Sequence, residues 1–115
     1  MTTASARASG VGEDGATPLI VDVRETDEFA TMRVPGAVLM PLSGFADSYE
    51  NLPRDRPLLI MCAAGSRSMV ATDHLLRHGF GDVTNVVGGI TAWRAAGLPV
   101  RSGAVEPGEG DLPSA

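Results

Sequence analysis

The chain contains no lysine, because all nine of its basic residues are arginines. Schiff-base chemistry and catalysis by a lysine base are therefore excluded. Aromatic residues make up only 4% of the 115 residues, so aliphatic side chains must supply most of the hydrophobic core. A chain of this length supports one domain with a sizeable core and is too short for two.

Cysteine is equally scarce, and Cys62 is the only one. One thiol cannot form a disulfide within the chain or build a thiolate zinc site, and a Cys-x-x-Cys redox pair would lack its second member. His74 and His78 stand four residues apart on a predicted helix, but no third ligand accompanies them. We therefore interpret both histidines as solvated helix residues and expect no metal site.

Positive charge and long apolar runs are also lacking. The formal net charge of −5 argues against a general binder of nucleic acid or acidic membranes. The longest uninterrupted apolar run, residues 58–64, is far too short to span a bilayer. Residues 1–16 have no apolar targeting core and contain Glu13 and Asp14, which disfavours a signal or transit peptide. We expect a soluble, cytoplasmic protein without nucleic-acid or membrane partners.

Composition divides the chain into three parts. Residues 1–16 are small and polar, whereas residues 102–115 are rich in glycine, proline and acidic residues. Both segments have little to bury, so both are predicted to be disordered tails. The folded domain is predicted to span residues 17–101, and it contains no internal repeat.

Short apolar runs alternate with helical patterns in this domain. The apolar runs predict strands at residues 18–23, 37–40, 58–61 and 83–87. Helices are predicted at residues 25–31, 43–52, 67–78 and 90–96. Thr26 and Ser43 are candidate N-caps, and Gly79 is a candidate C-terminal cap. Continuous apolar strands separated by helices imply an α/β fold with a mostly parallel sheet covered on both faces.

Cys62 follows the central apolar run directly and precedes a turn of small residues. Ligands of such sheets bind at the carboxyl ends of the strands, where Cys62 and residues 22–24 are expected. Successive backbone N–H groups before a helix form a cradle that favours negative charge, so a thiolate at its rim should ionise easily. The alternative is a small buried hydrophobic residue, as most free cysteines are. The small neighbours and nearby Arg67 favour a reactive thiolate.

Four motifs occur in the order typical of the single-domain rhodanese family. They are the loop Cys62-x-x-Gly-x-Arg-Ser, the segment LIVDVRE at 19–25 followed by Asp27, Glu28 and Phe29, the turn VPGA at 34–37, and VGGITAW at 87–93. The chain resembles this family over nearly all of residues 18–100. The resemblance implies a rhodanese-like α/β fold with a mostly parallel five-stranded sheet and helices on both faces.

The resemblance also implies sulfurtransferase activity with Cys62 as the catalytic residue. Its thiolate would attack the outer sulfur of thiosulfate or a persulfide donor, become a persulfide, and pass the sulfur to an acceptor. That acceptor would be cyanide in vitro or a thiol in the cell, and a protein acceptor is a further candidate partner. No metal or organic cofactor is needed. The loop is nearly neutral, with one arginine, so low-molecular-weight persulfides remain open as donors.

The loop residues fit this chemistry through their backbone and side chains. The backbone N–H groups expected to hold the thiolate, the persulfide and the donor oxyanion belong to Ala63, Ala64, Gly65, Ser66, Arg67 and Ser68. Arg67 would pair with a sulfonate-like oxyanion, unless it forms a structural ion pair. Gly65 is expected to supply an unusual backbone angle, and Ser66 or Ser68 a hydroxyl or a helix cap.

Other positions are assigned less directly. The family uses the segment of Asp22 and Arg24 to brace the active loop, although Arg24 could simply pair with Glu28 four residues later. Trp93 is expected to pack against the core. Where relatives often carry Gly-His before the Pro-Gly turn, this chain has Met32 and Arg33, and Leu39 replaces a common asparagine. Arg33 either brings positive charge to the mouth of the site or faces solvent.

Two other functions share these features. Dual-specificity phosphatases of the same fold, and arsenate reductases, use a cysteine loop, but the phosphatase loop has five residues between cysteine and arginine. Here four residues separate Cys62 from Arg67, which suits a sulfane sulfur better than a tetrahedral phosphate. A non-catalytic sulfur-sensing or interaction module is the other alternative, and the retained cysteine argues against it.

Overall fold

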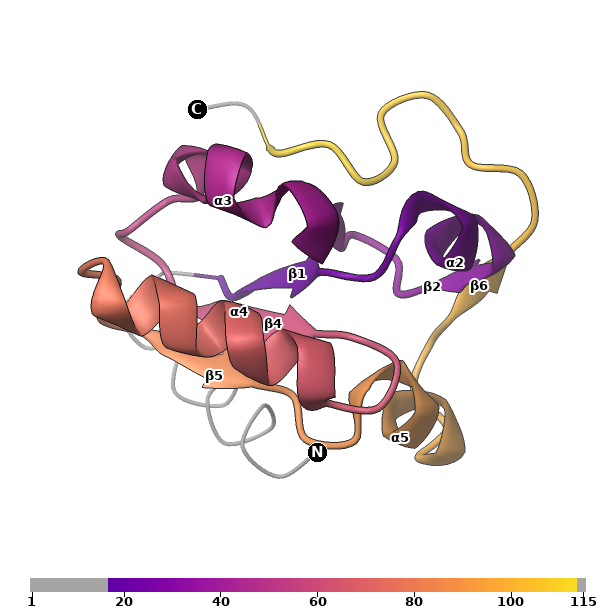
Figure 1. The fold of residues 1–115 in the computed structure, drawn as a ribbon. Helices are drawn as coiled ribbons and strands as arrows, with labels where there is room; N and C mark the ends of the chain where they lie inside the picture. The colour runs from indigo at the N-terminus through magenta and orange to yellow at the C-terminus, as the bar shows by residue number, and fades with distance from the viewer. Residues whose placement is uncertain (1–16, 114–115) are drawn as a thin grey trace.

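A computed structural model describes residues 17–113, so the predicted N-terminal tail at 1–16 lies outside the described residues. Its centre is a parallel sheet in the strand order β3-β1-β4-β5 (Figure 1). The strands are β1 (Leu19–Asp22), β3 (Val38–Leu39), β4 (Leu58–Met61) and β5 (Val83–Asn85). Every residue of β4 is buried, as its continuous apolar sequence predicts for a central parallel strand.

Helices cover both faces of this sheet. They are α2 (Thr26–Thr31), α3 (Phe45–Ser48), α4 (Ser66–Arg77) and α5 (Gly89–Ala95), and 3-10 turns at Leu42–Gly44 and Tyr49–Asn51 flank α3. Side chains alternate along β4, so Leu58 and Ile60 join the core beneath α3 and α4. Leu59 and Met61 join the second core, which contains residues of α2 and α5. The predicted parallel α/β fold with helices on both faces is therefore confirmed.

A small second sheet was not predicted. Strand β2 (Met32–Arg33) pairs antiparallel with β6 (Arg101–Ser102), apart from the main sheet. In the described part of the chain, the expected five-stranded sheet is therefore a four-stranded parallel sheet accompanied by this short ribbon. None of the helices within residues 17–113 is long and apolar enough to cross a membrane.

The C-terminal segment packs on the domain, which corrects the prediction of a disordered tail at 102–115 for its described part. The Leu39 N–H donates to the Gly110 carbonyl at 2.8 Å, and Val38 and Gly110 form a parallel bridge at the edge of the sheet. Leu112 packs against the core. In Figure 1 this segment passes over α2 and returns toward α3. Composition misleads here because the segment needs few apolar residues of its own when a buried side chain of the domain holds it.

That side chain is Arg33, whose expected place at the site mouth or in solvent is wrong. Arg33 is completely buried, and its guanidinium binds both carboxylate oxygens of Glu109 at 2.7 and 2.8 Å. It also donates to the carbonyls of Gly103 and Ala104, at 2.8 and 3.1 Å. Burial of an arginine requires such pairing. Arg33 therefore anchors the C-terminal segment to the domain.

The two predicted N-caps are also wrong. Glu25 is the N-cap of α2, and its N–H donates to the Glu28 carboxylate at 3.0 Å, so Thr26 lies inside the helix. Ser43 lies within a 3-10 turn, and its hydroxyl donates to the Glu25 carboxylate at 2.9 Å. Gly79 does follow the end of α4 with a φ of +88°, as predicted for a C-terminal cap.

Aromatic rings gather beside α4 and change the interpretation of one histidine. His74 is half-buried, with its ring edge-on to Tyr49 at 4.5 Å and stacked on His78 at 4.2 Å. It is thus a packing residue and not a solvated one, whereas His78 is exposed. Trp93 packs against the second core as predicted, and its indole N–H donates to the Pro99 carbonyl at 2.7 Å.

Candidate active site

Cys62 lies at the carboxyl end of β4, and the loop after it leads directly into α4 (Figure 1). Helix α4 begins at Ser66, one residue before the predicted start. Gly65 precedes it with a φ of +114°, a left-handed conformation that side chains resist. The unusual backbone angle expected at Gly65 is present, and it turns the chain so that the loop folds back over the thiol.

The Cys62 thiol meets hydrogen-bond donors of this loop. Its Sγ accepts the Gly65 N–H at 3.0 Å and lies 3.3 Å from the Ser68 hydroxyl. Burial is the largest single influence on the pKa of Cys62 and raises it. The Ser68 hydroxyl and the N–H groups of Ser68, Gly65 and Ala64 together outweigh burial, so the net pKa is lowered. The loop thus favours the thiolate.

Only 1% of Cys62 is exposed, so the thiol forms the floor of the loop. Ala64 and Ser66 are exposed above it, while Gly65 and Ser68 are buried beside it. Cys62 therefore has features of both interpretations made from the sequence. It packs with the core as a small buried residue does, and its thiol also faces the hydrogen-bond donors of the loop. Any reaction partner must bring a small terminal atom into the loop.

Asn85 is a site residue that sequence reasoning missed. It ends β5, and its Oδ1 lies 2.5 Å from the Ser68 hydroxyl, which also lies 3.2 Å from the Gly65 carbonyl. A hydroxyl has one proton to donate, so Asn85 competes with Cys62 for it. The available signal was a polar residue at the carboxyl end of an apolar strand beside β4.

The turn before α5 holds the loop from its outer side. The N–H groups of Ile90 and Thr91 donate to the carbonyls of Cys62 and Ala63 at 2.9 and 3.1 Å. Gly89 has a φ of +58°, and a Cβ there would collide with the Cys62 carbonyl. The Gly-Gly turn at 88–89 is therefore a close-approach site that fixes the backbone of the active loop.

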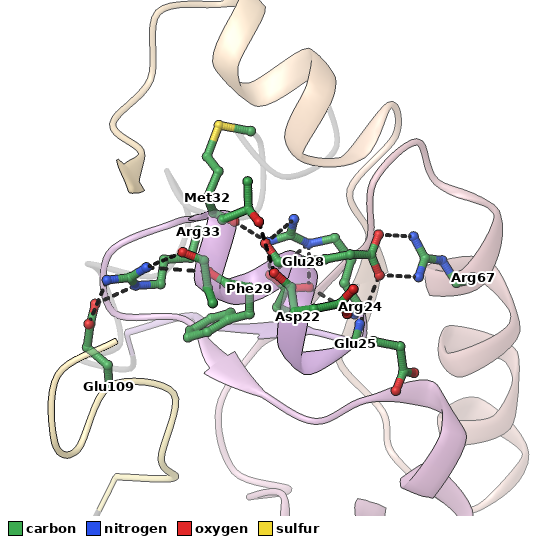
Figure 2. Close-up of polar contacts among 12 residues, drawn as sticks. Asp22, Arg24, Glu25, Glu28, Phe29, Met32, Arg33, Arg67 and Glu109 are labelled. Atoms are coloured by element: carbon green, nitrogen blue, oxygen red, sulfur yellow. Dashed lines mark hydrogen bonds and ion pairs between the residues drawn. The ribbon is translucent and has the colours of Figure 1, made fainter. Parts of the chain in front are cut away.

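Arg67 forms an ion pair with Glu28, and Figure 2 shows the two-pronged contact. The two Nη atoms lie 2.7 and 2.8 Å from the two carboxylate oxygens. Arg67 holds the pKa of Glu28 at about 2, well below its usual value, and Glu28 in turn raises the pKa of Arg67. Of the two roles considered for Arg67, the structure contains the ion pair.

Asp22 and Arg24 form a buried ion pair (Figure 2). Arg24 Nη2 lies 2.8 Å from Asp22, and the guanidinium also donates to the carbonyls of Met32 and Glu28, at 2.6 and 3.3 Å. The alternative considered from the sequence, in which Arg24 pairs with the Glu28 carboxylate, is not what the structure contains. Arg24 instead binds the backbone carbonyl of Glu28, and the carboxylate of the same Glu28 binds Arg67.

An apolar groove of about 590 Å³ lies beside the loop. It is lined by Ala64, Gly65, Ser66, Met69, Val70, Asp73, Asn85, Val87 and Gly88. Met69, Val70 and Val87 are each about 60% exposed. Within residues 17–113, His, Cys, Asp and Glu side chains do not gather in a group of three that could hold a metal ion.

The fold and this loop define an α/β domain with a single cysteine in an anion-favouring loop. The family model described as Rhodanese-like domain matches residues 7–96. The chain is 38% identical over 82 residues to a sulfurtransferase of Allochromatium vinosum, covering 71% of this chain and 77% of that protein. It is 35% identical over 89 residues to the thiosulfate sulfurtransferase GlpE of Pseudomonas savastanoi pv. phaseolicola, covering 77% and 82%.

Solved structures agree with these sequence relatives. The chain is similar to a rhodanese-related protein from Thermoplasma volcanium, with a TM-score of 0.72 and 30% identity over 82% of this chain and 93% of that one. A rhodanese-like domain protein from Staphylococcus aureus has a TM-score of 0.67 and 32% identity, with 82% and 91% covered. The chain belongs to the rhodanese-like domain family.

Proposed function

We propose that this protein is a sulfurtransferase of the thiosulfate sulfurtransferase type, in which Cys62 carries the sulfur. The observation that carries the proposal is the Cys62 Sγ, which accepts the Gly65 N–H and lies beside the Ser68 hydroxyl at the end of β4. The names of the two sequence relatives support it. A cytoplasmic location fits a single free thiol, since a reducing compartment preserves it.

The reaction proceeds in two displacements. The Cys62 thiolate attacks the outer sulfur of the donor, the donor's S–S bond breaks, and sulfite or a thiolate leaves with the bonding electrons. The acceptor, which is cyanide in vitro or a thiol in the cell, then attacks the terminal sulfur of the Cys62 persulfide. Cys62 leaves as the thiolate, so atoms and electrons balance without a metal or organic cofactor.

The loop supplies the electrostatic support for both steps. Backbone N–H groups of residues 63–68 stabilise the thiolate and the persulfide anion, and Ser68 adds a hydroxyl. Asp22 and Arg24 support the loop indirectly, through α2. The apolar groove beside the loop gives a small thiol or an acceptor protein an approach to the persulfide.

A phosphatase or arsenate reductase is the weaker candidate. In either enzyme the loop arginine must bind the substrate oxyanion, whereas both Nη atoms of Arg67 already bind Glu28. The loop is also one residue shorter than that of the phosphatases. A non-catalytic interaction or sulfur-sensing module is disfavoured by the lowered pKa of Cys62.

The test is turnover with thiosulfate and cyanide, followed as thiocyanate, beside turnover of a phosphate ester. The wild-type protein should form thiocyanate, Cys62→Ser should not, and Ser102→Ala should match the wild type because Ser102 is an exposed residue of β6. A persulfide donor with a thiol acceptor serves as a parallel assay. Turnover of the phosphate ester alone would overturn the proposal.

A further inference from the structure

Arg67 is the only basic residue in the active loop, and its positive charge is already matched. Its Nη1 and Nη2 atoms each bind one oxygen of Glu28, at 2.7 and 2.8 Å (Figure 2). Both side chains are about one third exposed, so the pair lies at the edge of the site and not within the core. A bidentate pair of this kind leaves little of the guanidinium fork for a second anion.

Glu28 is held in this position from two sides. Its Oε1 also accepts the Glu25 N–H at 3.0 Å, in the first turn of α2. Its carbonyl accepts Arg24 Nη1 at 3.3 Å, and Arg24 is itself fixed by Asp22. The pKa of Glu28, lowered to about 2 by Arg67, keeps the carboxylate charged throughout the neutral range. Arg67 is thus neutralised by a fixed group.

The other charged side chains around the loop do not add positive charge. Arg24 pairs with Asp22, which leaves that pair neutral. Glu25 is close enough to raise the pKa of Arg67, so it adds negative charge to the same edge. The attraction for a substrate anion therefore comes from the backbone N–H groups around Cys62. By Coulomb's law, the loss of a free cation beside these donors weakens the binding of a dianion more than that of a singly charged donor.

The two donor classes differ in this respect. Thiosulfate enters with two negative charges, and sulfite leaves with both of them. An alkyl persulfide has at most one charge on its sulfur pair and leaves as a thiolate. With thiosulfate, the Cys62 thiolate and the dianion become a persulfide anion and sulfite. With a protonated alkyl persulfide, the Cys62 thiolate and the donor become the protonated Cys62 persulfide and an alkyl thiolate. Both steps conserve charge, but the first places more negative charge in the site, so a free cation nearby stabilises it more.

We propose that Glu28 is a specificity-determining residue that withholds Arg67 from the donor and thereby directs the site toward alkyl persulfides over thiosulfate. The inference rests on the proposed function, since it presumes that Cys62 accepts sulfur. Glu28 acts through Arg67 and is a positioning residue, so replacing it alters the choice between donors.

The decisive variant is Glu28→Gln, which retains the side-chain shape and an oxygen for the Glu25 N–H but removes the charge. Released Arg67 should raise kcat/KM for thiosulfate roughly fivefold, as expected for one partly exposed charge near a dianion. The value for an alkyl persulfide should change less than about twofold, because that donor has a smaller charge. Added salt should reduce the gain with thiosulfate.

Asp27→Asn is the matched control, because Asp27 is an exposed neighbour on the same helix and the change in net charge is the same. It should leave the ratio of the two kcat/KM values unchanged. Glu28→Gln combined with Arg67→Gln should abolish the gain with thiosulfate. Arg67→Gln alone exposes the Glu28 charge, so it should lower the thiosulfate value more than the persulfide value, and it tests the inference even if Glu28→Gln folds poorly.

The inference is overturned if Glu28→Gln raises kcat/KM equally for both donors, lowers kcat/KM for thiosulfate, or leaves the ratio of the two kcat/KM values unchanged. It is equally overturned if Asp27→Asn reproduces the shift. A wild-type protein that accepts sulfur from neither donor contradicts the proposed function itself, which is a separate result. A wild-type protein that accepts sulfur from both donors, with an unaltered ratio in Glu28→Gln, contradicts only the role of Glu28.

Discussion

The Ser68 hydroxyl lies 3.3 Å from the Cys62 Sγ, and it is the only side-chain donor among the groups that lower the pKa of this thiol. Ser68→Ala removes this donor and leaves the backbone N–H groups of the loop in place. Since burial alone raises the pKa of Cys62, losing a compensating donor must move that pKa upward.

The magnitude follows from a hydrogen bond to a charged group, which contributes about 1.5–3 kcal/mol. The lower end applies here, because the hydroxyl proton is shared with Asn85 Oδ1 at 2.5 Å. About 1.5 kcal/mol corresponds to roughly a tenfold smaller ratio of thiolate to thiol at a given pH. Below the pKa of the wild-type thiol, the rate of Cys62 alkylation in the variant should therefore be about tenfold lower than in the wild type.

The assay is the pH dependence of alkylation of Cys62 under single-turnover conditions. A lowered pKa means that the thiolate is present at lower pH than for a free thiol, and the rate is lost as pH falls through that pKa. The Ser68→Ala curve should lie at higher pH, and the two curves should converge at high pH, where both thiols are ionised. Superimposed curves would refute the assignment of Ser68 as a donor to the thiolate.

Three further outcomes follow from other contacts. Asn85→Asp places a carboxylate 2.5 Å from the Ser68 hydroxyl. The carboxylate should accept the hydroxyl hydrogen bond in place of Cys62 and lower sulfur transfer at neutral pH several-fold, with Asn85→Ala having a smaller effect in the same assay. Arg33→Met removes the buried guanidinium that pairs with Glu109 and with the carbonyls of Gly103 and Ala104, so urea unfolding should show a loss of about 3 kcal/mol and proteolysis should cut the C-terminal segment first. Because the pKa values of Glu28 and Glu109 are lowered to about 2, their contribution to stability is complete above pH 4.5 and is lost as pH falls toward 2, so acid titration by circular dichroism should show unfolding in this window; full stability at pH 2 would contradict both ion pairs.

Elements with a strong local pattern were predictable from the sequence. Strand β4 has the predicted bounds of 58–61, because four consecutive apolar residues between turn signals are typical of a buried strand. The predicted bounds of helix α4 differ from the observed ones by only one residue at each end, because the glycines Gly65 and Gly79 flank the helix with positive φ angles. The position of Cys62 at the carboxyl end of the central strand followed from these two elements.

Features that depend on distant contacts were not predictable. Arg33 and Glu109 are 76 residues apart, and neither residue reports its partner through local periodicity. Strands of two residues, such as β2 and β6, are too short to show an alternating pattern. The ion pair of Arg67 with Glu28 spans 39 residues, so sequence reasoning could only present it as one of two roles.

Asn85 illustrates a signal that was present but unused. It was included in a predicted strand at 83–87, although the strand ends at Asn85 itself. A polar amide at the carboxyl end of the strand adjacent to β4 faces the same edge as Cys62, and parallel sheets bind ligands at that edge. Applying that rule to every strand would have added Asn85 to the site.

The central claim is that the Cys62 thiolate accepts a sulfane sulfur. The most direct measurement is intact mass spectrometry of the protein after incubation with thiosulfate or an alkyl persulfide, followed by peptide mapping and treatment with cyanide. The account predicts a mass gain of one sulfur atom on the peptide that contains Cys62, its removal by cyanide as thiocyanate, and no gain in Cys62→Ser. A gain that persists in Cys62→Ser, or no gain with either donor in the wild type, would contradict the account.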